Sequence, residues 1–172
     1  MKSNHFILAA IIGLGASGMA LAADAAASES KVQVTLENPE NYSDVRDAFL
    51  ASDKGKAGNI DLIRQYVEKE AAKYVPDGQK LEVTITNIDL AGDFEPWGQA
   101  GSEDIRIVKD IYPPRIDLSY KLTDSTGSVV KEGTRELRDL NFMMKINIHR
   151  DDALRYEKAL IKDWVRKDLK TG

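Results

Sequence analysis

Apolar and polar residues alternate along four stretches of the chain with the period of a β-strand. In residues 31–37, Val32, Val34 and Leu36 alternate with charged and polar neighbours. This period places every second side chain on one face, which is typical of a strand with one buried side. The same pattern predicts further strands at residues 80–90, 104–108 and 115–123. A fifth strand is predicted at residues 129–137, where the chain returns after a turn.

Two local features refine these predicted strands. Within residues 80–90 the apolar positions change phase after Ile85, which predicts a β-bulge near Thr86 and Asn87. The stretch Asp-Ser-Thr-Gly-Ser at 124–128 contains only turn-forming residues and lies between the last two predicted strands. These two strands are therefore expected to form a β-hairpin.

One predicted helix lies between the first two strands. Apolar residues repeat with the 3.6-residue period of an amphipathic helix over residues 60–75. Asn59 is its predicted N-cap, and the Pro-Asp-Gly turn at 76–78 ends it. Residues 38–58, which contain a proline and two glycines, are predicted to be a connection with a short helical turn at 48–51.

A second helix is predicted at the end of the chain, over residues 151–169. Its apolar stripe includes Trp164, whose ring is therefore expected in the core. Glu157 falls on the same stripe and is its one charged interruption.

The predicted order of elements is β-α-β-β-β-β-α. Four consecutive strands after one helix exclude a doubly wound parallel sheet, because that architecture alternates strands with helices. We expect an α+β fold, built as a two-layer sandwich with a mainly antiparallel sheet of about five strands and two helices on one face. Residues 31–172 would form this single domain.

The first 22 residues have the pattern of a secretory signal peptide. A basic start at Lys2 precedes an apolar run that several glycines dilute, and Ala-Leu-Ala at 20–22 forms a small-x-small cleavage site. We expect cleavage after Ala22, a flexible leader at 23–30, and no membrane anchor afterwards. The product would be soluble and exported, either periplasmic or extracellular.

Composition excludes several function classes. The chain has no cysteine, so disulfides, cysteine nucleophiles and lipid-modified cysteine anchors are ruled out. Its net charge of −4 argues against nucleic-acid binding, which needs clustered lysine and arginine. If the signal peptide is removed, His149 is the one remaining histidine, and neither a nucleophile elbow nor a phosphate-binding glycine loop occurs. We therefore expect no cofactor.

Several motifs resemble one bacterial family. These are "LEVTITNIDLAGDFEP", "IRIVKDIYPPRIDLSYKL", the Gly127 turn, "KEG" and the late Tyr156 and Trp164. Together they resemble the exported proteobacterial proteins called domain of unknown function 3016. The resemblance covers most of the chain after the signal peptide. It implies a small exported domain without an established activity, and it supplies no catalytic residues.

A bend rich in charged residues separates the third predicted strand from the fourth. Pro113 and Pro114 cannot donate ladder hydrogen bonds, so they explain a corner at which the apolar positions change phase. They do not explain the polar residues that crowd the same stretch, which are Arg106, Lys109, Asp110, Tyr112 and Arg115. These residues could bind an anion or an acidic partner, or they could pair with Asp89, Asp93 or Asp110 and fix the bend. We favour the second, structural interpretation.

Two further candidates lie in the loop before the bend. Trp97 stands between Pro96 and Gly98, where an aromatic side chain could contact a sugar or a protein, or anchor the loop on the sheet. Carboxylates gather at Asp89, Asp93 and Glu95. They could hold a hard cation such as calcium or act as a glycosidase pair. Because acidic loops are usually only solvated, we expect no metal.

Two main function classes remain open. The first is a non-enzymatic binding or accessory module of the cell envelope, which would use the Trp97 loop and the bend to contact an unknown protein or envelope ligand. We favour it because the usual catalytic constellations are missing from the sequence. The second is a hydrolase that acts on an envelope polymer through carboxylates near Asp89 and Asp93. A purely structural domain that pairs with itself is a third possibility.

Overall fold

The computed structural model describes residues 30–46, 53–95, 105–145 and 151–170. Four strands form the main sheet in the spatial order β1, β2, β5 and β6. Their bounds are Val32–Leu36, Lys80–Asp89, Arg115–Thr123 and Val129–Arg138. β1 runs parallel to β2, whereas the other two pairs are antiparallel.

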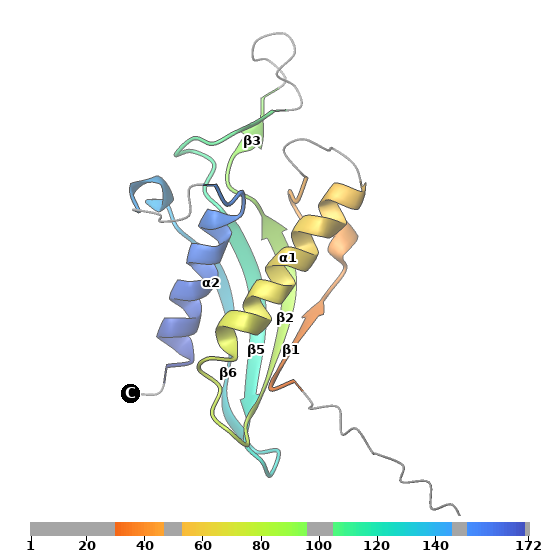
Figure 1. The fold of residues 1–172 in the computed structure, drawn as a ribbon, viewed down its shortest axis with the longest axis vertical. Coiled ribbons are helices and arrows are strands. Elements are labelled where there is room, and N and C mark those ends of the chain that lie inside the picture. The colour runs from red at the N-terminus through yellow and green to blue at the C-terminus, as the bar shows by residue number, and fades with distance from the viewer. Residues whose placement is uncertain (1–29, 47–52, 96–104, 146–150, 171–172) are drawn as a thin grey trace, which may run out of the picture.

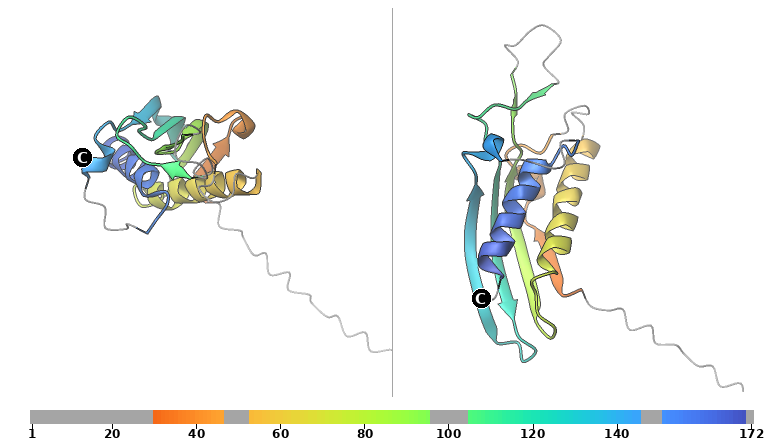
Figure 2. Two further views of the ribbon diagram at one scale, coloured as in Figure 1. Left: turned by 90° about the horizontal axis from the view of Figure 1, so that it is seen from above. Right: turned by 60° about the vertical axis from the view of Figure 1, so that its left-hand side comes forward.

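Two helices cover one face of this sheet (Figures 1 and 2). They are α1, Asp53–Ala71, and α2, Arg155–Asp168. α1 is the crossover that joins the parallel strands β1 and β2, because two parallel neighbours cannot be linked by a hairpin. The predicted α+β fold with helices on one side of a mainly antiparallel sheet is confirmed.

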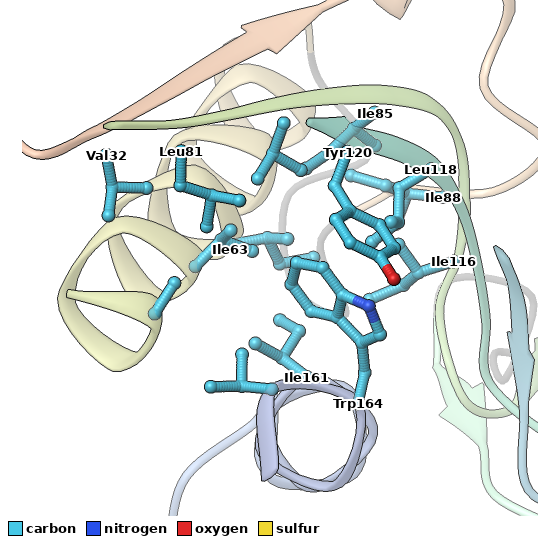
Figure 3. Packing of buried hydrophobic residues seen from close by; sticks show 14 of the residues in the cluster. Val32, Ile63, Leu81, Ile85, Ile88, Ile116, Leu118, Tyr120, Ile161 and Trp164 are labelled. Atoms are coloured by element: carbon cyan, nitrogen blue, oxygen red, sulfur yellow. The ribbon is translucent and has the colours of Figure 1, made fainter. Parts of the chain in front are cut away.

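The hydrophobic core lies between the helices and the sheet. α1 contributes Ile63 and Val67, which are fully buried, and α2 contributes Ile161 and Trp164. The Trp164 ring packs edge-on against Tyr120 of β5, with ring centroids 5.7 Å apart (Figure 3). The prediction that Trp164 is a core residue is therefore confirmed.

The opposite face of the sheet carries polar residues, as strand alternation requires. Glu82 of β2 lies opposite Lys121 of β5, and Thr84 lies opposite Ser119. The alternation that predicted the strands thus separates the helix-covered face from the face that the helices leave open.

Both local predictions about the strands are confirmed. The β2–β5 register shifts between Ile85 and Asn87, where the apolar phase changes. β5 and β6 form a hairpin, in which Asp124 Oδ1 accepts the backbone N–H of Thr126 at 2.8 Å. Gly127 has φ +83°, a conformation that side-chain-bearing residues rarely adopt.

The predicted start of the first helix is wrong. α1 begins at Asp53, so both glycines of the supposed connection lie inside the helix. Asn59 is not its N-cap; its side-chain Nδ2 is buried and donates to the backbone oxygen of Val45 at 3.2 Å. This tertiary contact and the acidic residue in the first turn favour helix despite a cost of about 1 kcal/mol per glycine. The helical turn predicted at 48–51 lies outside the described residues.

The two helices also end or begin differently from the predictions. α1 stops at Ala71, and tighter turns carry the chain on to Tyr74. α2 begins at Arg155 because Asp152 turns the chain before it. Asp152 Oδ1 accepts the N–H of Leu154 at 3.0 Å, which satisfies a backbone donor at the helix start.

The third predicted strand does not join the main sheet. Of its described residues 105–108, only Arg106–Ile107 forms a strand (β4), and it pairs with the short strand β3, Asp93–Phe94. This two-stranded ladder projects beyond the end of the main sheet (Figure 1). The flanking Ile105 and Ile111 are 55% and 66% exposed, so the apolar phase before the prolines does not face the core.

Short 3-10 helices complete the described structure at Pro39–Asn41 (η1) and Phe142–Met144 (η2). Among the helices of residues 30–46, 53–95, 105–145 and 151–170, none combines the length and the apolar character that crossing a bilayer requires.

Candidate functional site

Arg106 of β4 is the central residue at the base of the ladder, by which we mean the place where β3 and β4 contact the segment before α1. Its side chain is only 9% exposed, and its guanidinium connects three separate segments. Nη1 donates to the backbone oxygen of Gly92 at 2.9 Å. Nη2 donates to the backbone oxygen of Arg46 at 3.0 Å and forms an ion pair with Asp44 Oδ2 at 3.0 Å. A buried guanidinium with this many acceptors is a strong anchor.

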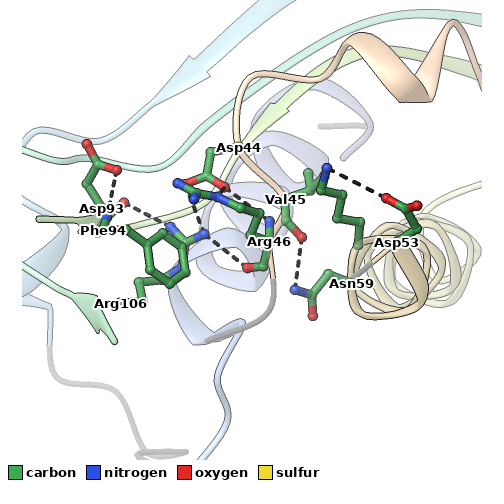
Figure 4. Close-up of polar contacts among 10 residues, drawn as sticks. Asp44, Val45, Arg46, Asp53, Asn59, Asp93, Phe94 and Arg106 are labelled. Carbon is green, nitrogen blue, oxygen red and sulfur yellow. Dashed lines mark hydrogen bonds and ion pairs between the residues drawn. The ribbon is translucent and has the colours of Figure 1, made fainter. Parts of the chain in front are cut away.

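The Phe94 ring of β3 lies close to two guanidinium groups (Figure 4). The central carbon of Arg46 is 4.1 Å from the ring centroid, and that of Arg106 is 4.7 Å away. Both distances are within the range of cation–π attraction. Phe94 is buried, so this stack attaches β3 to the segment that precedes α1.

Gly92 permits the close approach of the two strands. Its φ is +87°, and a Cβ atom there would lie 2.7 Å from the backbone oxygen of Ile107. Its N–H donates to the backbone oxygen of Tyr112 at 3.0 Å. Glycine is therefore required here both for the left-handed conformation and for the space.

A second polar cluster holds the other side of the ladder. Lys109 Nζ lies 2.6 and 2.8 Å from the two carboxylate oxygens of Glu95, and the Tyr112 hydroxyl donates to the same carboxylate at 3.1 Å. The hydrogen bond from Lys109 lowers the pKa of Glu95 from its ordinary range. Glu95 consequently remains ionised and keeps the segment before β5 against the ladder.

The remaining charged residues of the bend point elsewhere. Arg115 pairs with Asp117 at 2.8 Å and lies 3.8 Å from Glu136 on β6. Asp110 is exposed and forms no ion pair with the described residues. Pro113 and Pro114 are both buried, in keeping with a corner. Trp97, Glu103, Asp104 and His149 lie outside the described residues.

The structure therefore brings together some predicted site residues and separates others. Arg106, Lys109, Tyr112 and Glu95 all hold the base of the ladder. Their partners are Asp44, Glu95 and backbone oxygens rather than the Asp89, Asp93 or Asp110 that sequence reasoning considered. A role of the bend as a contact surface stays a prediction.

Asp89 and Asp93 line a cleft of about 350 Å³ that adjoins the base of the ladder and shares Asp44 and Tyr112 with it. We call it the acidic cleft for its three aspartates, although Arg46 and Arg138 also border it. Asp89 ends β2 and lies beside Asp44, with which it forms an isolated parallel bridge. Burial raises the pKa of Asp89 above its ordinary range, and the negative charge of Asp44 adds to the effect. Over the described residues, no cluster of three potential ligands suits a metal ion.

Sequence reasoning missed Asp44, Arg46 and Phe94 as parts of this region. The first two fall in the supposed connection, where no periodic pattern marked them. Glu157 did carry a signal, because it was the one charged residue on the apolar stripe of α2. Its side chain is 1% exposed, and its Oε1 accepts the N–H of Ala91 at 2.7 Å.

Comparison with known proteins assigns the chain to a family. A family model described as "Protein of unknown function (DUF3016)" matches residues 30–167. The chain belongs to this family. The DUF3016 match begins just before β1 and ends within α2, so it covers the sheet, the ladder and both helices. It confirms the resemblance seen in the sequence, but its description names no activity. No curated protein and no solved structure matches the chain.

Proposed function

We propose that this DUF3016 protein is an exported, soluble and non-enzymatic binding or accessory module of the cell envelope. Its ladder would present residues 96–104, including Trp97, to a protein or an envelope ligand. The observation that carries this proposal is the anchoring of the two strands that flank this segment. Binding residues are commonly found on loops that a rigid scaffold holds in place.

Side-chain contacts hold the ladder in addition to its own two-residue backbone pairing. β3 is held by the Phe94 stack and by the hydrogen bond between Gly92 and Arg106. The chain on either side is held by the Glu95–Lys109 ion pair. A short isolated pair of strands is marginal in water, so these side-chain contacts supply the stability that the ladder lacks.

Tryptophan fluorescence offers a direct test of binding. Trp164 is buried, so Trp164→Phe would leave Trp97 as the reporter. We expect peptidoglycan or lipopolysaccharide fragments, or an envelope protein extract, to shift the emission of Trp97 saturably. Because Trp97→Ala removes the reporter, its binding is measured by isothermal titration calorimetry beside the wild type. Trp97→Ala should lose binding in this assay, whereas Met144→Ala, which removes another exposed apolar side chain, should keep it. Equal binding by wild type, Trp97→Ala and Met144→Ala would refute the proposal.

Export needs its own test. Fractionation of producing cells and the intact mass of the product should show a periplasmic or secreted protein that begins at Ala23. A product that retains residues 1–22 in the cytoplasm would contradict this part of the proposal.

One observation favours a second candidate, a carboxylate-dependent hydrolase that acts on an envelope polymer. A carboxyl group with a raised pKa beside other carboxylates is a common arrangement in general acid catalysis, and Asp89 has it. Turnover of an envelope polymer that disappears in both Asp89→Asn and Asp93→Asn, with folding intact, would support the hydrolase. Unchanged turnover in these variants would exclude the acidic cleft as the active site.

A further inference from the structure

The two outer strands of the main sheet, β1 and β6, differ at their free edges (Figure 1). On β6, Lys131 and Arg135 point to the helix-covered side, where both bond to Asp168 of α2. Cations that point inward on an outer strand oppose pairing with another strand, because the partner would bury them. The helix-facing side chains of β1 are all apolar and carry no such charge. β1 is therefore the edge that is suited to accept a further strand.

Alternate residues of β1 turn their backbone groups away from β2. The pairing with β2 uses the odd-numbered residues, from the oxygen of Lys31, 2.8 Å from its donor, to the N–H of Glu37, 2.9 Å from its acceptor. The even-numbered residues between them point to the free edge. The Ser30 hydroxyl bonds to the backbone of Val32 there. The next outward N–H and C=O groups, on Val34 and Leu36, are a template for a further strand.

The sequence of β1 is complementary to itself. When two copies pair antiparallel about a two-fold axis at Val34, Val32 lies opposite Leu36, and Gln33 lies opposite Thr35. An axis perpendicular to the sheet leaves the helices of both copies on one side, so apolar side chains meet only apolar ones. Antiparallel strands exchange hydrogen bonds at every second residue, and in this register these are the even-numbered residues that point outward.

The charges at the two ends of β1 match in the same register. Lys31 lies opposite Glu37 of the second copy, and the two-fold axis repeats this pair. Glu37 is exposed and forms no ion pair with another residue of the described ranges. Lys31 pairs with Asp77, but the two side chains are 45% and 96% exposed, so this contact contributes little. Both end residues are therefore available to a second copy.

We propose that β1 binds the β1 edge of a second copy of this chain, antiparallel about Val34, so that two sheets join into one. A strand of five residues buries a small area, at the low end of specific interfaces. The dimer is therefore weak, and it forms at micromolar or higher concentrations of protein. The contact does not involve the Trp97 segment, so this inference is independent of the function proposed above.

Sedimentation equilibrium of the purified protein, from micromolar to millimolar concentration, tests the pairing. We expect a dimer whose share rises with concentration. Lys31→Glu and Glu37→Lys should each weaken dimerisation about tenfold, because the axis turns two attractive pairs into two repulsive ones. The double variant Lys31→Glu/Glu37→Lys should regain wild-type dimerisation. Glu132→Lys, the same charge change on β6, should leave it unchanged, and circular dichroism checks that every variant is folded.

The register has a separate test, because the chain contains no cysteine. A mixture of the single variants Gln33→Cys and Thr35→Cys is oxidised with glutathione disulfide and analysed by intact mass. Residues directly opposite each other lie closer than diagonal ones, so the mixed disulfide should exceed both disulfides between identical copies. Thr134→Cys on β6 is the control and should form few dimers.

Three results would overturn the proposal. A protein that stays monomeric at millimolar concentration would leave the β1 edge to a segment of another protein. Dimerisation that ignores both single charge changes, or that the double variant does not regain, would place the contact on another surface. Equal yields of the three disulfides would exclude antiparallel pairing about Val34. None of these results depends on Trp97, so failure here leaves the proposed function testable.

Discussion

Replacing Arg106 by methionine should destabilise the protein more than the same change at Arg115. Methionine keeps most of the aliphatic length but removes the guanidinium. Among the described residues, the substitution leaves Asp44 with its contacts to Arg46, the backbone N–H at 3.1 Å and Nε at 3.4 Å. It also leaves the backbone oxygens of Gly92 and Arg46 without their donor.

The expected loss follows from burial. Breaking a buried ion pair by removing one partner costs about 3–5 kcal/mol, and Arg106 is 9% exposed while Asp44 is 13% exposed. Arg106 Nε is buried without a hydrogen-bond partner among the described residues, and the substitution removes this unfavourable group. We therefore do not expect a loss of stability above this range. The free energy of unfolding of a native protein is about 5–15 kcal/mol, so the expected loss is a large fraction of the total stability. For a chain of this size, the thermal midpoint should fall by roughly 6–20 °C.

Arg115→Met is the matched control. Arg115 is 40% exposed; it pairs with Asp117, which is 16% exposed, and lies farther from Glu136, which is 77% exposed. Because the guanidinium itself reaches solvent, its loss should cost about 1 kcal/mol, less than the loss of Arg106. Urea unfolding followed by far-UV circular dichroism would give both free energies of unfolding. Combining Arg106→Met with Asp44→Asn should give a loss smaller than the sum of the single losses, because the two residues interact. Equal losses at Arg106 and Arg115 would refute the anchoring argument.

Four further substitutions have defined outcomes. Gly92→Ala should destabilise the protein by about 1–3 kcal/mol, because Gly92 has a positive φ and a Cβ atom there would contact Ile107. Gly58 lies inside α1 with open space around it, so Gly58→Ala should stabilise the protein by about 0.5–1 kcal/mol. Urea unfolding measures both changes. The pKa of Glu95 is lowered in the folded state, so the ionised carboxylate stabilises the fold. This stabilisation is present above the unfolded pKa of about 4.3 and is lost as pH falls. The thermal unfolding midpoints of wild type and Glu95→Gln should therefore converge in acid. The pKa of Glu157 is raised in the folded state, so ionisation of this carboxyl group destabilises the fold as pH rises. The stability of Glu157→Gln relative to wild type should therefore increase with pH in thermal unfolding.

Each of these predictions can fail clearly. Destabilisation by Gly58→Ala would mean that the start of α1 needs glycine for a reason that its open surroundings do not show. A constant stability difference for Glu95→Gln across the acid range would mean that Glu95 is not held ionised by Lys109. A pH-independent difference for Glu157→Gln would mean that burial does not perturb this carboxyl group.

The sequence predicted the hairpin and the four strands of the main sheet well because their signals are local, whereas the strand predicted at 104–108 does not join that sheet. The predicted range 115–123 coincides with β5, and 129–137 differs from β6 by one residue. Alternation and a turn of small polar residues are sufficient there. The start of α1 was missed because Asn59 bonds to Val45, and a contact across 14 positions leaves no periodic trace.

The candidate site was predictable only in part, for the same reason. Charge density in the bend drew attention to Arg106, Lys109 and Tyr112, which the structure places at the base of the ladder. Their partners could not be found in this way. Arg106 reaches Arg46 across 60 residues, and the Phe94 stack depends on both arginines. Such pairings follow from the fold and not from local composition.

The ladder lies at one end of the sheet, so the two ends of the domain differ. β1 starts at the opposite end, where Val32 pairs with Leu81 near the beginning of β2 (Figure 1). β2 has ten residues and spans about 30 Å, so the start of β1 lies roughly that far from the ladder. α2 also runs away from the ladder, from Arg155 towards Asp168. Labels or surface tethers attached beside the start of β1 or the end of α2 would therefore leave the ladder accessible, which suits immobilised-protein capture experiments.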